Sequence, residues 1–216
     1  YYEGLIQNFP KASPAALAEA HFLLGRAAFD QGDFKSSISH MAEAKTLDPQ
    51  KYGEQVNVLS VLSYHKLQDV NKLKEALETL QKENPSAVAR VPDVIPAWLG
   101  LQAYGMKDLE TADKYMTWAT QNDQLQNVKK VIWRNLAKVR LALKKYDRAL
   151  VASNNFLKDE DQPYRRADGM LDKASILLGL GKYSDARKTA EEALALGVEG
   201  PLMASLKTVS YTHLRA

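Results

Sequence analysis

The sequence predicts an all-α protein, an α-solenoid of stacked antiparallel helix hairpins. The first observation is a hairpin between Phe22 and Pro49, where two stripes of apolar residues at helical spacing flank a break at Gly32-Asp33. The second observation is that a small or apolar residue recurs in the middle of the first helix of each predicted hairpin. These landmarks are Gly25, Val61, Gly100, Ala137 and Ala174, which are spaced by 36, 39, 37 and 37 residues. A helix hairpin repeated at a nearly constant period is typical of a solenoid.

The second helices keep the same register. Their landmarks are Ser37, Leu73, Ala112, Ala149 and Ala186, which repeat at the same four intervals. A short turn separates the two helices of each hairpin, with a polar or glycine residue placed before an apolar one, as in Gly32-Asp33-Phe34. Two helices joined in this way must lie antiparallel, and small residues let their axes approach to roughly 8–10 Å. We therefore expect the small landmarks to mark the helix crossings.

Taken in order, the elements form one array over residues 1–209. Residues 1–10 predict the end of a preceding repeat, and 201–209 predict the start of a further one. Between them lie five repeats, at about 14–49, 51–85, 92–124, 128–161 and 165–198. Neither end has the polar outer face of a capping repeat, so we expect a fragment of a longer array. Residues 210–216 depart from the repeat pattern and resemble a translated adaptor sequence, so we expect them to be non-native.

The repeats resemble the tetratricopeptide repeat (TPR) family. The first hairpin has Leu24-Gly25, Gly32-Asp33-Phe34, Met41, Ala44 and Pro49 at the family's positions, and the third has Trp98-Leu99-Gly100. The resemblance implies a right-handed, TPR-like superhelix whose first helices line a concave face. The opening residues, from Tyr2 to Phe34, are similar to repeats of bacterial cell-envelope proteins of the barrel-assembly lipoprotein and Tol-Pal coordinator type. This favours a bacterial source, and the periplasm or cell envelope slightly over the cytoplasm.

Composition excludes several classes of function. The chain has 216 residues, of which 45% are apolar and 25% charged, and a formal net charge of +3. That charge is too small to indicate a nucleic-acid or membrane partner by itself. Because the chain has no cysteine, disulfides, thiolate metal sites and cysteine nucleophiles are excluded. No run of about 18 apolar residues predicts a membrane-spanning helix.

No motif in the sequence predicts catalysis. The four histidines, His21, His40, His65 and His213, have no partner at the spacing of metal ligands, and we expect His21 to be packed or hydrogen-bonded. Glycines before Lys182 lack the spacing and preceding strand of a phosphate-binding loop. The sequence therefore predicts no catalytic, cofactor-binding or metal residues, and no enzyme activity.

One basic segment, from Lys129 to Arg148, has eight basic residues and a single acid, Asp147. Arg134 and Lys138 share a helix face because they are four residues apart. Three interpretations stay open at this point: scattered solubilising charge, a site for an acidic peptide, and nucleic-acid binding, which the scarcity of interleaved aromatic residues disfavours.

The leading hypothesis is a non-catalytic scaffold that binds a peptide or protein segment along the concave face of the array. The candidate groove residues are Phe22, Arg26, Phe29, Tyr104, Arg134 and Lys138. We expect an acidic residue of the partner near Arg134 and Lys138. The alternative is a helical-repeat appendage of a larger enzyme or signalling protein. An RNA-binding helical repeat is disfavoured, since no polar pair recurs at the same positions of each first helix.

Overall fold

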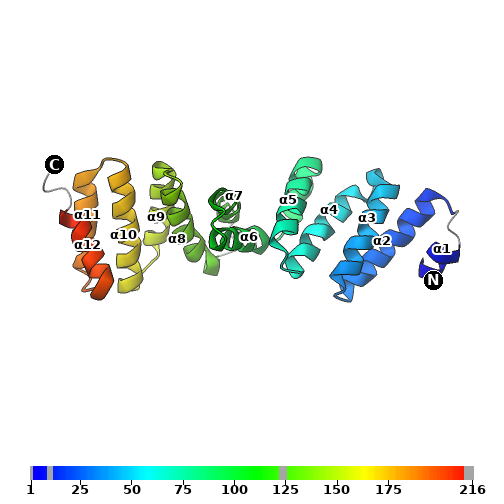
Figure 1. The fold of residues 1–216 in the computed structure, drawn as a ribbon, viewed down its shortest axis with the longest axis horizontal. Helices are drawn as coiled ribbons and strands as arrows, with labels where there is room; N and C mark the ends of the chain where they lie inside the picture. Colours follow the sequence, from blue (N-terminus) through cyan, green and yellow to red (C-terminus); the bar gives the residue numbers. More distant parts are fainter. Residues whose placement is uncertain (1, 9–11, 122–125, 212–216) are drawn as a thin grey trace. The chain divides into compact units, whose positions relative to one another are not determined.

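A computed structural model describes residues 2–8, 12–121 and 126–211 of the chain. Every regular element in these ranges is helical, which confirms the predicted all-α class. Helix hairpins stack side by side within each of two compact units, residues 1–95 and 96–216, and so build an α-solenoid (Figure 1). None of these helices has the length and apolar character needed to cross a bilayer.

Over its described residues, the first unit contains five α-helices and one 3₁₀ helix. They are α1 (Tyr2–Asn8), α2 (Pro14–Asp30), α3 (Phe34–Leu47), α4 (Pro49–Lys66), α5 (Val70–Glu83) and the 3₁₀ helix η1 (Pro85–Arg90). Helices α2 to α5 each pack against the next helix along the chain. Their core includes Ala18, Met41, Ala44, Tyr52 and Val56, all of which are buried.

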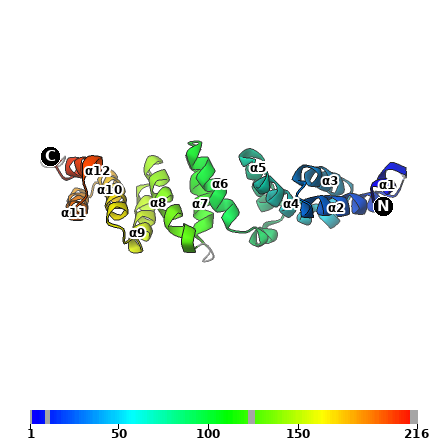
Figure 2. The same cartoon turned by 90° about the horizontal axis from the view of Figure 1, so that it is seen from below.

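The second unit follows the same plan. It contains α6 (Val94–Gly105), which begins just before the boundary, then α7 (Leu109–Thr120), α8 (Gln126–Ala142), α9 (Tyr146–Lys158), α10 (Pro163–Gly179), α11 (Tyr183–Leu194) and α12 (Gly200–Tyr211). From α7 to α12 each helix again packs against its neighbours in the chain (Figure 2). Ser210 and Tyr211 belong to α12, whereas 212–216, the rest of the tail that we expect to be non-native, lie outside the described residues.

The turn within each hairpin contains one residue in the left-handed backbone conformation. The φ angles are 82° at Gly32, 56° at Gln68, 63° at Lys107, 57° at Lys144 and 71° at Gly181. These residues are spaced by 36, 39, 37 and 37 positions, the intervals of the sequence landmarks. In each turn the next backbone N–H donates to the carbonyl five residues earlier, which closes the first helix in a Schellman-type cap. The repeat period is therefore a property of the backbone as well as of the sequence.

An aspartate follows the left-handed residue in the first three turns and starts the second helix. The Oδ1 atoms of Asp33, Asp69 and Asp108 accept hydrogen bonds of 3.0–3.2 Å from backbone N–H groups three residues later. Such N-caps satisfy a helix donor that would otherwise lack a partner. The last two turns have Lys145 and Lys182 at this position, without a side-chain cap.

Small residues lie where the helices cross, as the landmarks predict. A Cβ atom built on Gly25 would lie 3.0 Å from the Met41 side chain, and one built on Gly100 would lie 2.7 Å from Met116 Cγ. The later landmark Ala149 is completely buried. Met41 and Met116 occupy the space that the two glycines leave open, so the crossings are closely packed.

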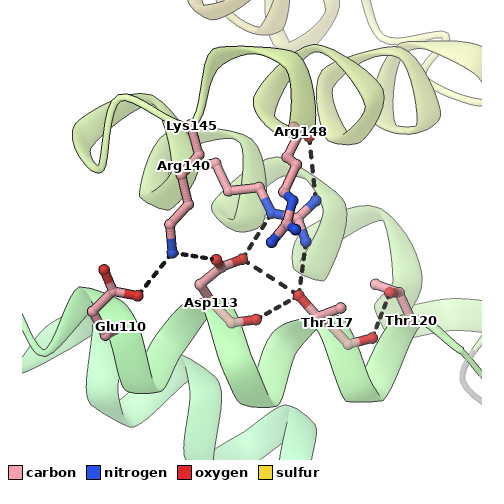
Figure 3. A network of polar contacts seen from close by, with 7 residues as sticks. All are labelled: Glu110, Asp113, Thr117, Thr120, Arg140, Lys145 and Arg148. Atoms are coloured by element: carbon pink, nitrogen blue, oxygen red, sulfur yellow. Dashed lines mark hydrogen bonds and ion pairs between the residues drawn. The ribbon is translucent and has the colours of Figure 1, made fainter.

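A buried polar network joins α7 to α8 and α9 (Figure 3). The Arg140 guanidinium donates from Nε to Asp113 Oδ1 over 2.7 Å and also to Thr117 Oγ1 over 2.7 Å. Lys145 Nζ contacts Asp113 Oδ2 at 3.0 Å and Glu110 at 2.8 Å. Burial by itself would raise the pKa of Asp113, but the hydrogen bonds from Arg140 and Lys145 lower it. The network thus buries a carboxylate that stays charged.

Candidate functional site

One candidate site is a cavity of about 390 Å³ in the second unit. It is formed by one residue of α6, one face of α8, the end of α9 and the start of α10. The lining residues are Tyr104, Lys130, Val131, Arg134, Asn135, Lys138, Phe156, Glu160 and Arg165. Four cations, two aromatic rings, an exposed valine, the Asn135 amide and a single acid, the buried Glu160, therefore surround one space. Such a mixture suits a ligand that has both apolar and acidic groups.

Helix α8 supplies most of the charge. Lys130, Arg134 and Lys138 are spaced by four residues, so they share one face of the helix. Arg134 forms an ion pair with Asp168 of α10, and Lys138 Nζ lies 3.6 Å from Asp172 Oδ2, also on α10. The two cations singled out by the sequence thus already have carboxylate partners within the unit.

Asp172 is the more buried of the two carboxylates. Burial raises its pKa above the ordinary value, although the charges of Lys138 and Arg134 act in the opposite direction. Its Oδ2 atom accepts no hydrogen bond from the described residues. The Lys138–Asp172 contact is consequently a loose ion pair at the wall of the cavity.

Phe156 forms the apolar floor of the cavity. Its ring is buried, and the Arg134 guanidinium carbon lies 5.8 Å from the ring centroid, within the range of a cation–π contact. Gly169 of α10 lies directly against this ring, and a Cβ atom there would overlap it. The absence of a side chain at residue 169 therefore lets α10 approach the floor closely.

A second, smaller cavity of about 190 Å³ lies in the first unit. Phe22 and Arg26 of α2 line it together with Gln55, Val58, Leu59 and Arg90. The Phe22 ring stacks on Tyr52, with centroids 4.6 Å apart. Phe29 is not among the lining residues, because its ring packs edge-on against Phe34 at 5.4 Å beside the turn.

The structure thus brings the six candidate residues together in two sets. Phe22 and Arg26 share the cavity of the first unit, Tyr104, Arg134 and Lys138 share the cavity of the second, and Phe29 contributes to packing at the α2–α3 turn. Sequence reasoning missed Lys130, Phe156 and Arg165 as lining residues. Lys130 lies in the basic segment that had been noted, whereas no signal in the sequence distinguishes Phe156 or Arg165.

His21 is packed and hydrogen-bonded, as expected from the sequence. Its Nδ1 atom lies 3.0 Å from Nδ1 of His40, because the antiparallel hairpin brings residues 19 positions apart into contact. Burial, together with the neighbouring His40, lowers the pKa of His21, while Glu43 acts in the opposite direction. Within the described ranges, no group of three or more His, Asp or Glu side chains is placed to hold a metal ion. The contact between His21 and His40 is therefore a hydrogen bond between the two helices of the hairpin.

Comparison with known proteins supports the family resemblance in the first hairpin. Residues 18–51 match the family model described as the tetratricopeptide repeat. They extend from α2 through α3 into the start of α4. No curated protein matches the chain. Helical repeats of this type generally provide surfaces for protein–protein interaction, so the fold suggests protein partners.

Solved structures with a similar chain trace include three bacterial examples. BtubC from P. vanneervenii is 17% identical, with 90% of this chain and 85% of that chain covered and a TM-score of 0.43. The protein pilF of Pseudomonas aeruginosa is also 17% identical, with 90% and 87% covered and a TM-score of 0.43. A thermophilic TPR protein of Thermus thermophilus is 20% identical, with 89% and 98% covered and a TM-score of 0.39.

Proposed function

We propose that this chain is a non-catalytic interaction scaffold that binds a peptide or protein segment through the first helices of its hairpins. The observation that carries this proposal is the cavity of the second unit, which combines Tyr104, Val131 and Phe156 with basic side chains from α8 and α10. The smaller cavity of the first unit repeats this chemistry with Phe22 and Arg26. A segment with apolar anchors and acidic residues would complement each of these cavities.

The partner would bind mainly through the apolar part of each cavity. Val131 is half exposed at the rim, and Tyr104 is partly buried against the core of the second unit. Side chains of this kind gain free energy when a partner removes them from water, at about 25 cal/mol per Å² of apolar surface. The similarity of the opening residues to repeats of bacterial cell-envelope proteins favours a bacterial source for the chain, and the periplasm or cell envelope slightly over the cytoplasm as the setting.

The proposal can be tested by panning a phage-displayed dodecapeptide library against the whole chain. We expect enrichment of peptides that combine apolar and acidic residues. Their dissociation constants would then be measured by fluorescence polarisation with labelled synthetic peptides. Val131→Ser should weaken binding about tenfold, which corresponds to about 1.4 kcal/mol.

Val151 provides a matched control. It is exposed to a similar extent as Val131, 56% against 50%, but it lies on α9 and does not line the cavity. Val151→Ser should therefore leave the affinity unchanged. Failure to enrich any peptide, or equal losses in the two variants, would refute the proposed function.

A further inference from the structure

The ion pairs between α8 and α10 follow one register. Asp168 follows its partner Arg134 by 34 residues, and Asp172 follows its partner Lys138 by the same 34 residues. The basic residues are four positions apart on α8, and their partners are four positions apart on α10. The two helices therefore carry a ladder of ion pairs, with one rung for each helical turn.

The next position of this ladder has a cation but no acid. Lys130 precedes Arg134 by four residues, and the residue 34 positions after Lys130 is Tyr164. Tyr164 is exposed to 62% at the start of α10. Among the described residues, no carboxylate forms an ion pair with Lys130 or with Arg165, the residue next to Tyr164. Two cations that form no ion pair with a carboxylate in the described part of the chain thus lie in the lining of the same cavity.

We propose that this vacant third rung is a subsite for a carboxylate of the bound partner, received by Lys130 and Arg165. The inference rests on the proposed function and specifies the chemistry of its ligand. Arg165 offers planar, paired donors that match a carboxylate, and Lys130 adds a point charge. The neighbouring Val131 and Phe156 would contact an apolar residue next to the acid.

Arg134 and Lys138 are poorer candidates for this contact than the sequence indicates. An incoming carboxylate would have to compete with Asp168 and Asp172, which are held in place by the same fold and have a high effective concentration. At Lys130 and Arg165 the ligand would not have to displace a carboxylate of the described residues from an ion pair. The ion pairs Arg134–Asp168 and Lys138–Asp172 instead hold α8 and α10 together beside Lys130.

This proposal can be tested directly, because a substitution in the chain itself can supply the missing carboxylate partner of Lys130. Tyr164→Glu introduces a carboxylate at the position that the register pairs with Lys130. It should lower the affinity for an enriched acidic dodecapeptide at least tenfold. Lys130→Gln and Arg165→Gln should each lower it to a similar extent. Tyr183→Glu is the matched control, since Tyr183 is half exposed at the start of α11 and does not line the cavity.

The peptides are varied in parallel. Replacing each Asp or Glu by its amide should reproduce the loss in the unmodified chain and have no further effect in Tyr164→Glu. Amidation of the peptide C-terminus separates a terminal carboxylate from an acidic side chain as the bound group. If acidic and amide peptides bind the unmodified chain equally well, the subsite is refuted while the proposed function stands.

Two other results would overturn the inference. If no dodecapeptide binds, the proposed function fails and the subsite fails with it. If a single-stranded oligoribonucleotide binds at the same salt concentration and Tyr164→Glu abolishes that binding while peptides are unaffected, the two cations bind phosphate and the carboxylate assignment is wrong.

Discussion

Arg140 Nε donates a hydrogen bond to Asp113 Oδ1 over 2.7 Å, and both side chains are only 9% exposed. Removing one member of a buried ion pair leaves the other charge without compensation. Because Lys145 also contacts Asp113, part of the compensation would remain. We expect Arg140→Met to lower the free energy of unfolding by about 3 kcal/mol. The change would be measured from the urea midpoint at constant m-value.

The exposed pair Arg187–Glu191 on α11 is the control for this measurement, with both side chains about half exposed. Arg187→Met should change the free energy of unfolding by less than about 0.5 kcal/mol, because solvent screens such pairs. Similar effects of the two substitutions would show that the α7–α8 network contributes no more than a surface contact.

A second prediction concerns Gly100, where α6 crosses α7. A Cβ atom there would lie 2.7 Å from Met116 Cγ and 2.9 Å from the Met116 backbone nitrogen, so the helices would have to separate. Gly100→Ala should destabilise the protein by about 1–3 kcal/mol through overpacking. Gly53, within α4, has no atom within 4 Å of its built Cβ. Gly53→Ala should therefore stabilise the protein by about 0.5–1 kcal/mol. The two changes in the free energy of unfolding would be measured by thermal or urea unfolding. If Gly100→Ala and Gly53→Ala both stabilise or both destabilise the protein, this account of the packing is contradicted.

Backbone strain in the interhelix turns gives a third prediction. Lys107 has φ of 63°, a left-handed conformation that side chains disfavour and glycine tolerates. Lys107→Gly should raise the free energy of unfolding by up to about 1 kcal/mol. Lys188→Gly, at an exposed position within α11, should lower it by about the same amount. Destabilisation by Lys107→Gly in equilibrium urea unfolding would mean that the turn tolerates lysine without strain.

Histidine titration gives a fourth prediction. Burial lowers the pKa of His65, with a further contribution from Lys66, and burial and His40 lower that of His21. Each group then binds fewer protons in the folded state than in the unfolded state. The free energy of unfolding should therefore decrease as the pH falls through the ordinary histidine pKa of 6.5.

Urea midpoints at pH 7.5 and pH 5.5 would measure this effect. The decrease on acidification should be smaller in His65→Gln and in His21→Gln than in the unmodified chain, because each variant removes one of the groups that gain a proton on unfolding. A decrease of unchanged size in both variants would assign the acid sensitivity to other groups.

Much of the fold could be predicted because it depends on local rules. Apolar residues at helical spacing predict the helices, and a breaker before Phe34 or Tyr183 predicts the turns. The same positions carry the left-handed backbone angles, as at Gly32 and Gly181. The crossing at Gly100 could be predicted too, since small residues are needed where helix axes approach.

The charge pattern of the site could not be predicted in the same way. The repeat period near 37 residues places Ala174 after Ala137, but the ion pairs join residues 34 positions apart. This offset depends on how α10 is shifted along α8, which the one-dimensional pattern does not contain. For that reason Arg134 and Lys138 stood out in the sequence, while Lys130 and Arg165 did not. The contact between His21 and His40 was missed because it depends on how the two helices of a hairpin face each other.

Because each helix packs mainly against the helices before and after it in the chain, most tertiary contacts within a unit join neighbouring helices. Little loop-closure entropy has to be lost before such contacts form, and helical proteins of this kind fold in microseconds to milliseconds. Because contacts are made mainly between neighbouring helices, the effect of a destabilising substitution should also stay local. A substitution that opens the α10–α11 hairpin should speed amide hydrogen exchange there and leave α2–α3 protected, since the two hairpins belong to different compact units. A proteolytic nick or destabilising change in one unit would thus remove the cavity of that unit while the cavity of the other unit stays folded.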